Sequence, residues 1–426
     1  MSPLIPKESE RPRRMLRALR YWLSRKWIDR ELARVQFSVL PRAKTPDSDD
    51  AARRMFPPVD ARLGPGVNVY GYLYGEFGLG ETSRRYSEAL LDAGYPVTLI
   101  DAGIDIPHSC GDRRLSMIVS DIPVHPVNIV FINPDHFLEV LPKLRPGGYT
   151  IGFWFWELGV IPESWLKALD HVDEVWVATE FIERAFRQVT DKPVVRIPHP
   201  ISDTVAMEVS RADFDLDADT FVFLCTFDFN SSIHRKNPYA VLDAFKLAFP
   251  GGQEKVQLVL KSSNGHRYMH ELRRLCRYAK GDRRILIRDQ ILNVEQLRAL
   301  QQVADAYVSL HRAEGLGLGM AECMAMGKPV IGTAWSGNLD FMSEENSCLV
   351  PYRLVPIREG QYLHAGNSVW AEADVATAAD WMRRLASSPE IVARKGTVAR
   401  MEVTGSMSSA RAAEAMIARL RSLQSV

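Results

Sequence analysis

The sequence lacks the features of a membrane-spanning, secreted or disulfide-linked protein. Its 426 residues contain no run near the ~18–20 consecutive apolar residues that a spanning helix needs. The first residues, MSPLIPKE, form no apolar signal segment, so we expect no cleaved secretory leader. The five cysteines lie at least 25 residues apart. That spacing fits neither a zinc knuckle nor a redox pair, and it favours a reducing, cytoplasmic compartment.

A large net charge is also absent. The chain has 53 Lys and Arg against 52 Asp and Glu, with 46% hydrophobic and 25% charged residues. This is the balance of a globular protein, so a disordered or fibrous chain is not expected. At ~100–200 residues per domain, the length predicts two domains with extensions.

The N-terminal segment is the one strongly charged part. Residues 1–45 hold twelve Lys or Arg and four Asp or Glu, so this segment carries +8 and the rest of the chain −7. Its apolar residues fall on two helical faces rotated from each other: Leu16, Leu19, Leu23 and Trp27, then Ile28, Leu32, Val35 and Val39. A cationic amphipathic helix over residues 11–40 suits an anionic membrane surface, and packing on the protein's own surface is the alternative. Nucleic-acid binding is not favoured, because the acidic remainder offers no second basic patch.

Strands and helices alternate through most of the chain. Residues 46–58 are rich in Asp and Pro and are predicted to form a linker. Pro198-His199-Pro200 interrupts the alternation and is predicted to be a hinge. We expect His199 to orient this hinge. Alternation of this kind predicts parallel sheets with helices on both faces. The predicted fold is therefore α/β, with two Rossmann-like doubly wound lobes facing a central cleft. The predicted parts are a basic extension (1–60), a first lobe (61–200), a second lobe (201–380) and C-terminal helices (381–426) that pack back toward the first lobe.

The predicted elements form two series. Strands are expected at 67–72, 96–100, 127–132, 149–155, 174–178 and 194–197, then at 220–226, 256–261, 285–288, 306–310 and 329–332. Helices are expected at 81–93, 180–188, 238–249, 270–278, 294–302 and 319–326, and over 375–424 with breaks near Pro389 and Gly405.

Residues 309–322, SLHRAEGLGLGMAE, form the most informative segment, between a strand and a helix. Glycines at alternate positions let backbone N–H groups approach an oxygen-rich ligand, and the helix N-terminus behind them favours phosphate. Glu314 precedes the glycines and Glu322 lies within the helix. Because a carboxylate accepts two hydrogen bonds from a vicinal diol, each glutamate suits a sugar ring. A plain strand-to-helix turn with solvated glutamates is the alternative.

Glu314 and Glu322 form an E-x7-E pattern. Together with residues 311–317, 324–333 and 335–342, this segment resembles the retaining glycosyltransferases of family 4, within the group 1 glycosyl transferases. The resemblance covers roughly residues 67–355. It implies a GT-B fold and hexosyl transfer from a nucleotide-sugar with retention of configuration, without a required metal or other cofactor. It also implies that Glu322 binds the ribose hydroxyls, that Glu314 lies by the donor sugar, and that the backbone of Gly315, Leu316 and Gly317 contacts sugar and phosphate.

A leaving diphosphate needs positive charge, and residues 234–238, HRKNP, supply it ahead of a helix. Lys236 matches the family lysine that neutralises the diphosphate. Ser231 stands where the family often has an arginine. The second cation is therefore open between Arg235 and Lys261. The segment 288–291 resembles the place where relatives hold the base through backbone groups.

The first lobe offers further candidates. Residues 75–81, GEFGLGE, resemble the family's glycine-rich loop over the diphosphate, with Gly78 and Gly80 as donor-binding residues, although a tight turn is the alternative. His136 follows the third strand in a region where some relatives place a histidine near the donor sugar. With Glu314 and Lys236 it completes the predicted catalytic set.

An aromatic run ends another strand of this lobe. Trp154, Trp156 and the adjacent Glu157 are candidates for contact with the acceptor, since aromatic faces stack on sugar rings. A buried lobe core is the alternative for at least half of this run.

The resemblance implies a glycan or lipid-linked acceptor of cell-surface polysaccharide synthesis. It places the enzyme in the cytoplasm, or at the inner membrane face if residues 11–40 bind lipid. A nucleotide-sugar epimerase of the same fold and a non-catalytic nucleotide- or sugar-binding module are the alternatives.

Overall fold

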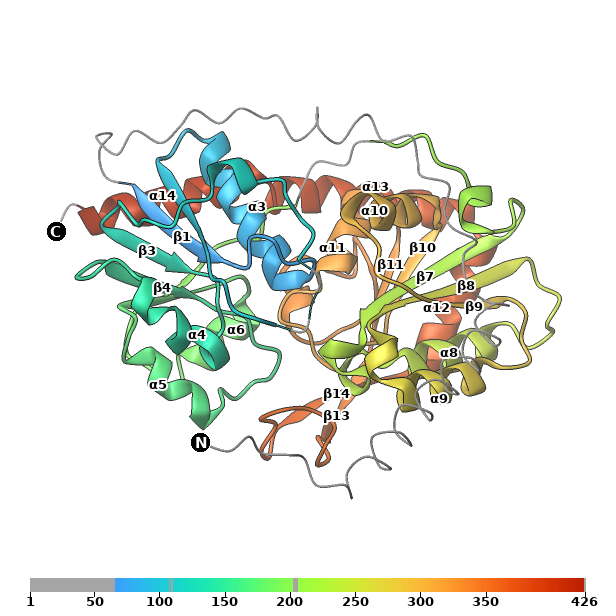
Figure 1. The fold of residues 1–426 in the computed structure, drawn as a ribbon. Helices are drawn as coiled ribbons and strands as arrows, with labels where there is room; N and C mark the ends of the chain where they lie inside the picture. The colour runs from blue at the N-terminus through green and yellow to red at the C-terminus, as the bar shows by residue number, and fades with distance from the viewer. Residues whose placement is uncertain (1–65, 107, 109, 202–205, 425–426) are drawn as a thin grey trace, which may run out of the picture.

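The computed structural model describes residues 66–106, 108, 110–201 and 206–424. The predictions for residues 1–60, including the amphipathic segment and the linker, lie outside the described residues. Figure 1 shows two lobes side by side, each a sheet between helices, with α11 between them. In the described part of the chain, no helix combines the length and hydropathy needed to span a bilayer.

The first lobe is built on a six-stranded parallel sheet in the order β2-β1-β3-β4-β5-β6. Its strands are β1 (Val67–Gly71), β2 (Val97–Asp101), β3 (Val127–Val130), β4 (Tyr149–Phe153), β5 (Glu174–Val177) and β6 (Val194–Arg196), and its helices are α3 (Gly78–Asp92), α4 (Pro134–Val140), α5 (Leu166–Leu169) and α6 (Glu180–Phe186). Helices cover both faces, so the strands are nearly continuous apolar runs. The strand order reverses between β1 and β3, which brings the loop after β1 to the edge where such sheets bind ligands.

The second lobe repeats this plan in the order β12-β11-β10-β7-β8-β9. Its strands are β7 (Phe221–Asp228), β8 (Val256–Ser263), β9 (Ile285–Asp289), β10 (Ala306–Ser309), β11 (Val330–Thr333) and β12 (Cys348–Val350), and its helices are α7 (Ile233–Lys236), α8 (Pro238–Ala248), α9 (Met269–Ala279), α10 (Val294–Val303) and α11 (Leu318–Ala325). Here the order reverses between β7 and β10. The basic segment follows β7 and the glycine-rich segment follows β10, so the switch point brings the two together.

The predicted fold class, two doubly wound α/β lobes, is confirmed. The sequence did not predict the short helices α4, α5 and α7, the short strand β12, or the antiparallel hairpin of β13 (Tyr352–Pro356) and β14 (Val369–Ala373). β12 has three residues and α4 has seven, too few to show a periodic pattern. His136, predicted in a loop, therefore lies on a helix that begins at Pro134.

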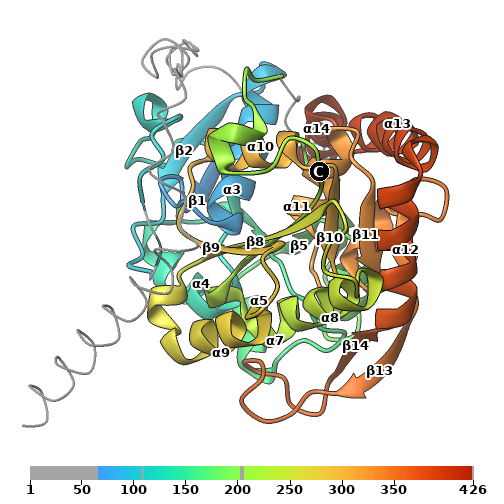
Figure 2. The same cartoon turned by 90° about the vertical axis from the view of Figure 1, so that its right-hand side faces the viewer.

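The C-terminal helices α12 (Val375–Ser387), α13 (Pro389–Ser406) and α14 (Ser409–Gln424) run along one side of both lobes (Figures 1 and 2). α12 packs on α8 and α13 on α11 of the second lobe, whereas α14 packs on α3 of the first. Near the hinge, Ile201 N–H donates to the Met407 carbonyl at 2.7 Å. His199 is buried there, with Nε2 3.1 Å from Thr82 Oγ1. The last helix thus ties the second lobe back to the first.

The contact of α14 with the first lobe depends on an ion pair. The Glu174 carboxylate on β5 is fully buried and accepts from Arg419 Nη2 at 2.5 Å. Tyr149 Oη also donates to it, at 3.1 Å. We expect Arg419→Met to lower the free energy of unfolding by about 1–3 kcal/mol, because a buried carboxylate loses its charged partner. Urea titration measures this effect. Arg411→Met is the matched control on the exposed side of the same helix, and an equal loss in both variants would contradict the assignment.

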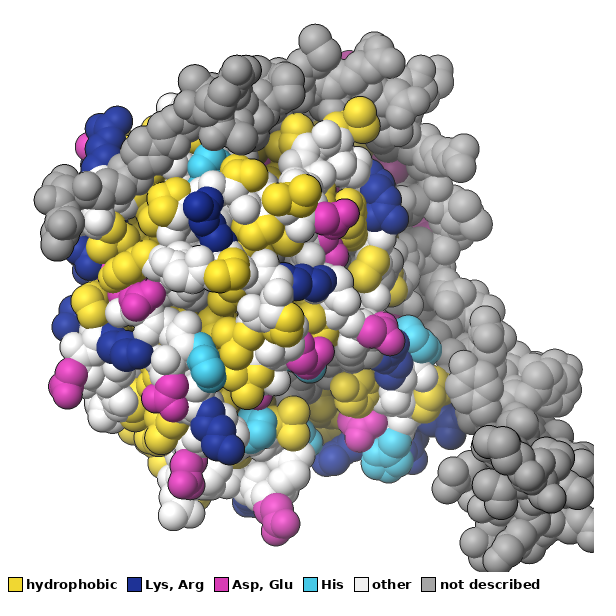
Figure 3. Space-filling model, turned by 60° about the vertical axis from the view of Figure 1, so that its left-hand side comes forward, with side chains coloured by type: hydrophobic (Ala, Val, Ile, Leu, Met, Phe, Trp, Pro, Cys, Tyr) yellow, Lys and Arg dark blue, Asp and Glu magenta, His cyan; other side chains and the backbone are white. Residues whose placement is uncertain are grey.

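On the face shown in Figure 3, Lys and Arg side chains are interspersed with Asp and Glu. The described part of this face therefore presents no broad patch of one charge sign.

Candidate active site

The basic segment after β7 forms a strained turn. Two non-glycine residues with positive φ flank the single turn of α7: Ser232 (65°) and Asn237 (51°). Ser232 Oγ accepts from Arg235 N–H at 3.4 Å, and Asn237 Nδ2 donates to the Leu310 carbonyl at 3.1 Å. Strained backbone of this kind persists only where its surroundings hold it in place. The turn is thus fixed against the end of β10, beside Glu314.

Glu314 is the centre of the cluster. Its side chain is buried, with Oε1 2.5 Å from Lys236 Nζ and Oε2 3.1 Å from Arg235 Nη1. Its backbone N–H donates to Ser336 Oγ at 2.8 Å. Burial raises the pKa of Glu314, but the Lys236 and Arg235 charges outweigh burial and lower this pKa to about 2. Glu314 is therefore a carboxylate at every physiological pH.

Arg235 is fully enclosed between carboxylates and carbonyls. Nη1 donates to the Ala313 carbonyl at 2.8 Å and Nε to the Ser231 carbonyl at 3.2 Å. Nη2 lies 3.5 Å from Glu157 Oε1, so the guanidinium joins carboxylates from both lobes. Burial lowers the pKa of Arg235, and Glu157 with Glu314 more than reverses the effect. Arg235 holds the site together as a permanent cation.

The loop behind Glu314 is locked by buried polar contacts. His311 Nε2 lies 3.1 Å from Asn338 Oδ1, and Asn338 Nδ2 donates to the Thr333 carbonyl at 2.9 Å. A Cβ on Gly337 would lie 2.0 Å from the Gly315 carbonyl oxygen, so only glycine fits there. Gly317 adopts φ +93° just before α11, a conformation that glycine takes without strain. These contacts hold the glycine-rich turn in one conformation.

Glu322 lies on α11 and faces the first lobe. Its Oε1 accepts from Arg85 Nη2 at 2.6 Å, and its Oε2 accepts from Gln301 Nε2 at 3.0 Å. Arg85 belongs to α3 of the first lobe, and Figure 1 shows α3 and α11 facing each other. The carboxylate thus sits where the two lobes meet.

The hairpin of β13 and β14 adds a second bridge between the lobes. Tyr362, in the loop between its strands, donates from Oη to Glu157 Oε2 at 2.6 Å. Its ring centroid lies 5.9 Å from that of Trp156. On the neighbouring strand end, Thr179 Oγ1 donates to the Gly315 carbonyl at 2.9 Å. The first lobe therefore contacts both sides of the Glu314 segment.

The structure brings Glu314, Lys236, Arg235 and Glu157 into one cluster, next to the Gly315–Gly317 turn. Two other predicted residues, His136 and Lys261, have different polar partners. His136 Nδ1 contacts Glu139 Oε1 at 2.7 Å, and the His136 side chain is 44% exposed on α4. Lys261 is buried at the end of β8, where Nζ donates to Ser263 Oγ at 2.7 Å. Burial lowers the pKa of Lys261 to about 8 despite the nearby charges of Asp228 and Asp289.

The structure corrects where three of the predicted residues lie. Trp154 is fully buried in the first-lobe core, against Phe137 and Phe186, so it offers no face to an acceptor. Gly78 and Gly80 lie in the first turn of α3 rather than in the loop before it. A Cβ on Gly80 would come within 2.3 Å of the Gly75 carbonyl oxygen, so glycine lets the helix start against that loop.

Sequence reasoning missed four residues that shape the site: Arg85, Gln301, Ser336 and Tyr362. Arg85 and Gln301 look like ordinary polar residues on amphipathic helices, and only the folded structure shows their contacts with Glu322. Tyr362 lies in the unpredicted hairpin. Ser336 is the one with a sequence signal, because it belongs to the WSGN segment quoted for the family resemblance.

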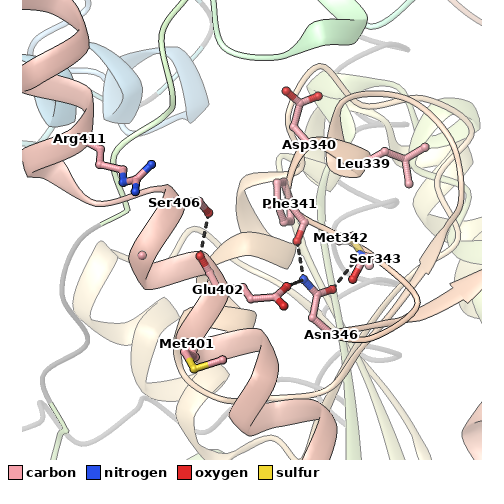
Figure 4. A pocket seen from close by; sticks show the side chains of 11 residues that line it. Leu339, Asp340, Phe341, Met342, Ser343, Asn346, Met401, Glu402, Ser406 and Arg411 are labelled. Carbon is pink, nitrogen blue, oxygen red and sulfur yellow. Dashed lines mark hydrogen bonds between the residues drawn. The ribbon is translucent and has the colours of Figure 1, made fainter.

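A separate surface hollow lies away from this cluster. Figure 4 shows its lining, in which Asn346 Nδ2 donates to Glu402 Oε2 at 2.6 Å and to the Phe341 carbonyl at 2.9 Å. None of the predicted site residues lines it. Within the described ranges, no group of three or more His, Cys, Asp or Glu side chains is arranged to hold a metal ion.

Comparison with known proteins finds one family model that matches the second lobe. Residues 220–356 match the family model of group 1 glycosyl transferases. No curated protein matches the sequence. The sequence resemblance to group 1 transferases is thus confirmed for the second lobe.

Similar solved structures include two complexes that contain UDP. One is TarM of S. aureus with fondaparinux, α-GlcNAc-glycerol and UDP, at 12% identity and TM-score 0.52, covering 72% of this chain and 57% of that chain. The chain therefore spans little more than half the length of TarM. The other is HepE of Anabaena with UDP and glucose, at 12% identity and TM-score 0.62, covering 84% of this chain and 100% of that chain.

Sucrose-phosphate synthase of Thermosynechococcus elongatus is a third similar structure, at 18% identity and TM-score 0.61, covering 85% of this chain and 100% of that chain. At these identities the likeness concerns the fold, which is GT-B. The chain therefore has the GT-B fold, and residues 220–356 of its second lobe resemble the group 1 glycosyl transferases.

Proposed function

We propose that this protein is a retaining glycosyltransferase that moves a hexose from a nucleotide-sugar to a hydroxyl acceptor. One observation carries the proposal: Lys236 and Arg235 meet Glu314 beside the glycine-rich turn, at the switch point of the second sheet. Glu322 follows on α11, the helix after that turn. The site would thus supply cations for a diphosphate, one carboxylate for the donor sugar and another for the ribose.

The two cations have different roles. Arg235 is buried and committed to Glu157 and Glu314, whereas the Lys236 side chain is 21% exposed and has one carboxylate partner. Lys236 is therefore the cation that turns toward the diphosphate, while Arg235 keeps Glu314 in place. The N–H groups at the start of α11 add partial positive charge.

The reaction that fits this site is a displacement on one face of the sugar. The acceptor oxygen bonds to the anomeric carbon as the bond from that carbon to the phosphate oxygen breaks, and the leaving phosphate oxygen takes the acceptor proton. No covalent glycosyl-enzyme is required. The enzyme acts by positioning and by stabilising charge on the diphosphate, and closure about residues 198–200 excludes water.

UDP is the first donor nucleotide to test, because the TarM and HepE structures contain UDP. For the acceptor we propose a glycan or lipid-linked intermediate of cell-surface polysaccharide synthesis, with Glu157 as its candidate contact. Trp156, the other predicted contact, is buried between Trp165 and Tyr362. Membrane attachment through residues 11–40, a donor contact of His136 and metal-independent turnover belong to the same proposal.

A thermal-shift panel of nucleoside diphosphates and nucleotide-sugars tests the proposal. A bound nucleotide stabilises the folded chain by about 2.7 kcal/mol at 100 times its Kd. We expect one nucleoside diphosphate to raise Tm, with or without EDTA, and Glu322→Ala to abolish most of that shift. Glu390→Ala, at an exposed position on α13, is the control.

The alternatives give different results. An epimerase converts the donor sugar without an acceptor, and a binding module shifts Tm without turnover of any donor. A chain that none of the nucleotides stabilises would contradict the proposed function.

A further inference from the structure

The carboxylate of Glu322 has partners from both lobes. Arg85 Nη2 on α3 donates to it at 2.6 Å, and Gln301 Nε2 on α10 donates at 3.0 Å. Arg85 is 3% exposed and Gln301 is fully buried. The three side chains therefore form an enclosed polar cluster, not a surface ion pair.

Each partner of Glu322 has one polar side-chain atom without a hydrogen-bond partner in the described part of the chain. Arg85 Nη1 and Gln301 Oε1 are buried and have no hydrogen-bond partner among the described residues. An unpaired buried polar atom costs about 1–3 kcal/mol, so two of them beside one carboxylate call for a ligand. A donor, a carboxylate and an acceptor in one cluster match a vicinal diol, because each hydroxyl both donates and accepts.

Arg85 is held in this orientation by its own lobe. Its Nε donates to Glu81 Oε1 at 2.7 Å, and Glu81 also accepts from Arg114 and from Arg84 Nη2. Burial raises the pKa of Glu81, but Arg85, Arg114 and Arg84 outweigh it and keep Glu81 ionised. Arg84 Nη1 in turn donates to the Gly75 carbonyl at 2.9 Å. The guanidinium of Arg85 is thus preoriented by a network that also fixes the loop before α3.

We propose that Arg85 and Gln301 complete the ribose subsite around Glu322. This inference rests on the proposed function and adds two residues to it. Arg85 Nη1 donates to one ribose hydroxyl, while Glu322 and Gln301 Oε1 accept from the diol. Because Arg85 comes from the first lobe, both lobes contact the ribose at once, so recognition of the diol favours the closed arrangement of the lobes.

The test compares ribose with deoxyribose. Calorimetry measures Kd for the nucleoside diphosphate that binds in the panel above, starting with UDP, and for its 2′-deoxy and 3′-deoxy analogues. For the wild type we expect at least one analogue to bind about tenfold more weakly, the size of one charge-assisted hydrogen bond. Arg85→Lys and Gln301→Met should each reduce that ratio to about threefold or less, since each removes one contact to the diol.

Arg114→Lys is the matched control. Arg114 belongs to the same network but contacts Glu81 and Asp112 rather than Glu322, so its ratio should equal that of the wild type. If Arg85→Lys and Gln301→Met weaken the binding of the ribose and deoxyribose nucleotides by the same factor, the Kd ratio stays at its wild-type value. That result would overturn the inference. If Arg85→Lys fails to fold, the ratio of Gln301→Met decides. A wild type that binds none of the nucleoside diphosphates refutes the proposed function itself.

Discussion

Lys236→Ala should lower kcat about 10²–10³-fold, the loss seen when one preorganised stabiliser of a developing negative charge is removed. Lys236 Nζ contacts Glu314 Oε1 at 2.5 Å, and the Lys236 side chain is partly exposed. The diphosphate gains charge as the bond to the sugar breaks, so a cation at that place acts mainly on the transition state. The effect should therefore fall on kcat more than on KM.

The measurement is steady-state transfer with the donor found in the nucleotide panel. Lys255→Ala, at an exposed position before β8, is the matched control and should leave kcat unchanged. Lys236→Arg should recover part of the loss because it restores the charge. Wild-type turnover in Lys236→Ala would refute the role of this lysine.

The sequence predicts the lobes well because most of their strands are buried apolar runs. Strands β7 and β8 are nearly buried throughout, so their apolar runs stand out between polar loops. The E-x7-E segment is equally visible, since its glycines and glutamates fall between a strand and a helix. The hairpin of β13 and β14 escaped prediction because β13 is mostly exposed and has little apolar pattern.

The site was harder to predict than the fold. The sequence left open whether Arg235 or Lys261 is the second cation beside Lys236. The answer depends on where two strand ends lie, and only the structure places Arg235 against Glu314. The aromatic run could face a ligand or fill a core. Trp154 lies in the core, whereas Trp156 packs both on Trp165 and on Tyr362 of the other lobe. Contacts between lobes, such as Arg85 with Glu322, have no local signal at all.

Arg235→Met should destabilise the folded protein by about 3–5 kcal/mol at pH 7, because it leaves buried carboxylates without their shared cation. Arg235 lies 3.1 Å from Glu314 and 3.5 Å from Glu157, and it bonds two carbonyls as well. A methionine of similar length fills the space but neutralises nothing. Urea unfolding measures the loss, and Arg353→Met on the exposed strand β13 is the control.

The loss should depend on pH in a defined direction. The pKa of Glu314 falls from 4.5 to about 2 on folding, since Lys236 and Arg235 together outweigh its burial. A carboxyl with a lowered pKa stabilises the fold above pH 4.5, and this stabilisation is lost as pH falls toward about 2. Removing Arg235 raises the pKa of Glu314 and shrinks that contribution. The difference between wild type and Arg235→Met should therefore be constant above about pH 5 and decrease below it. A difference that stays the same from pH 7 to pH 3 would show that Arg235 stabilises the protein through packing rather than through its charge on Glu314.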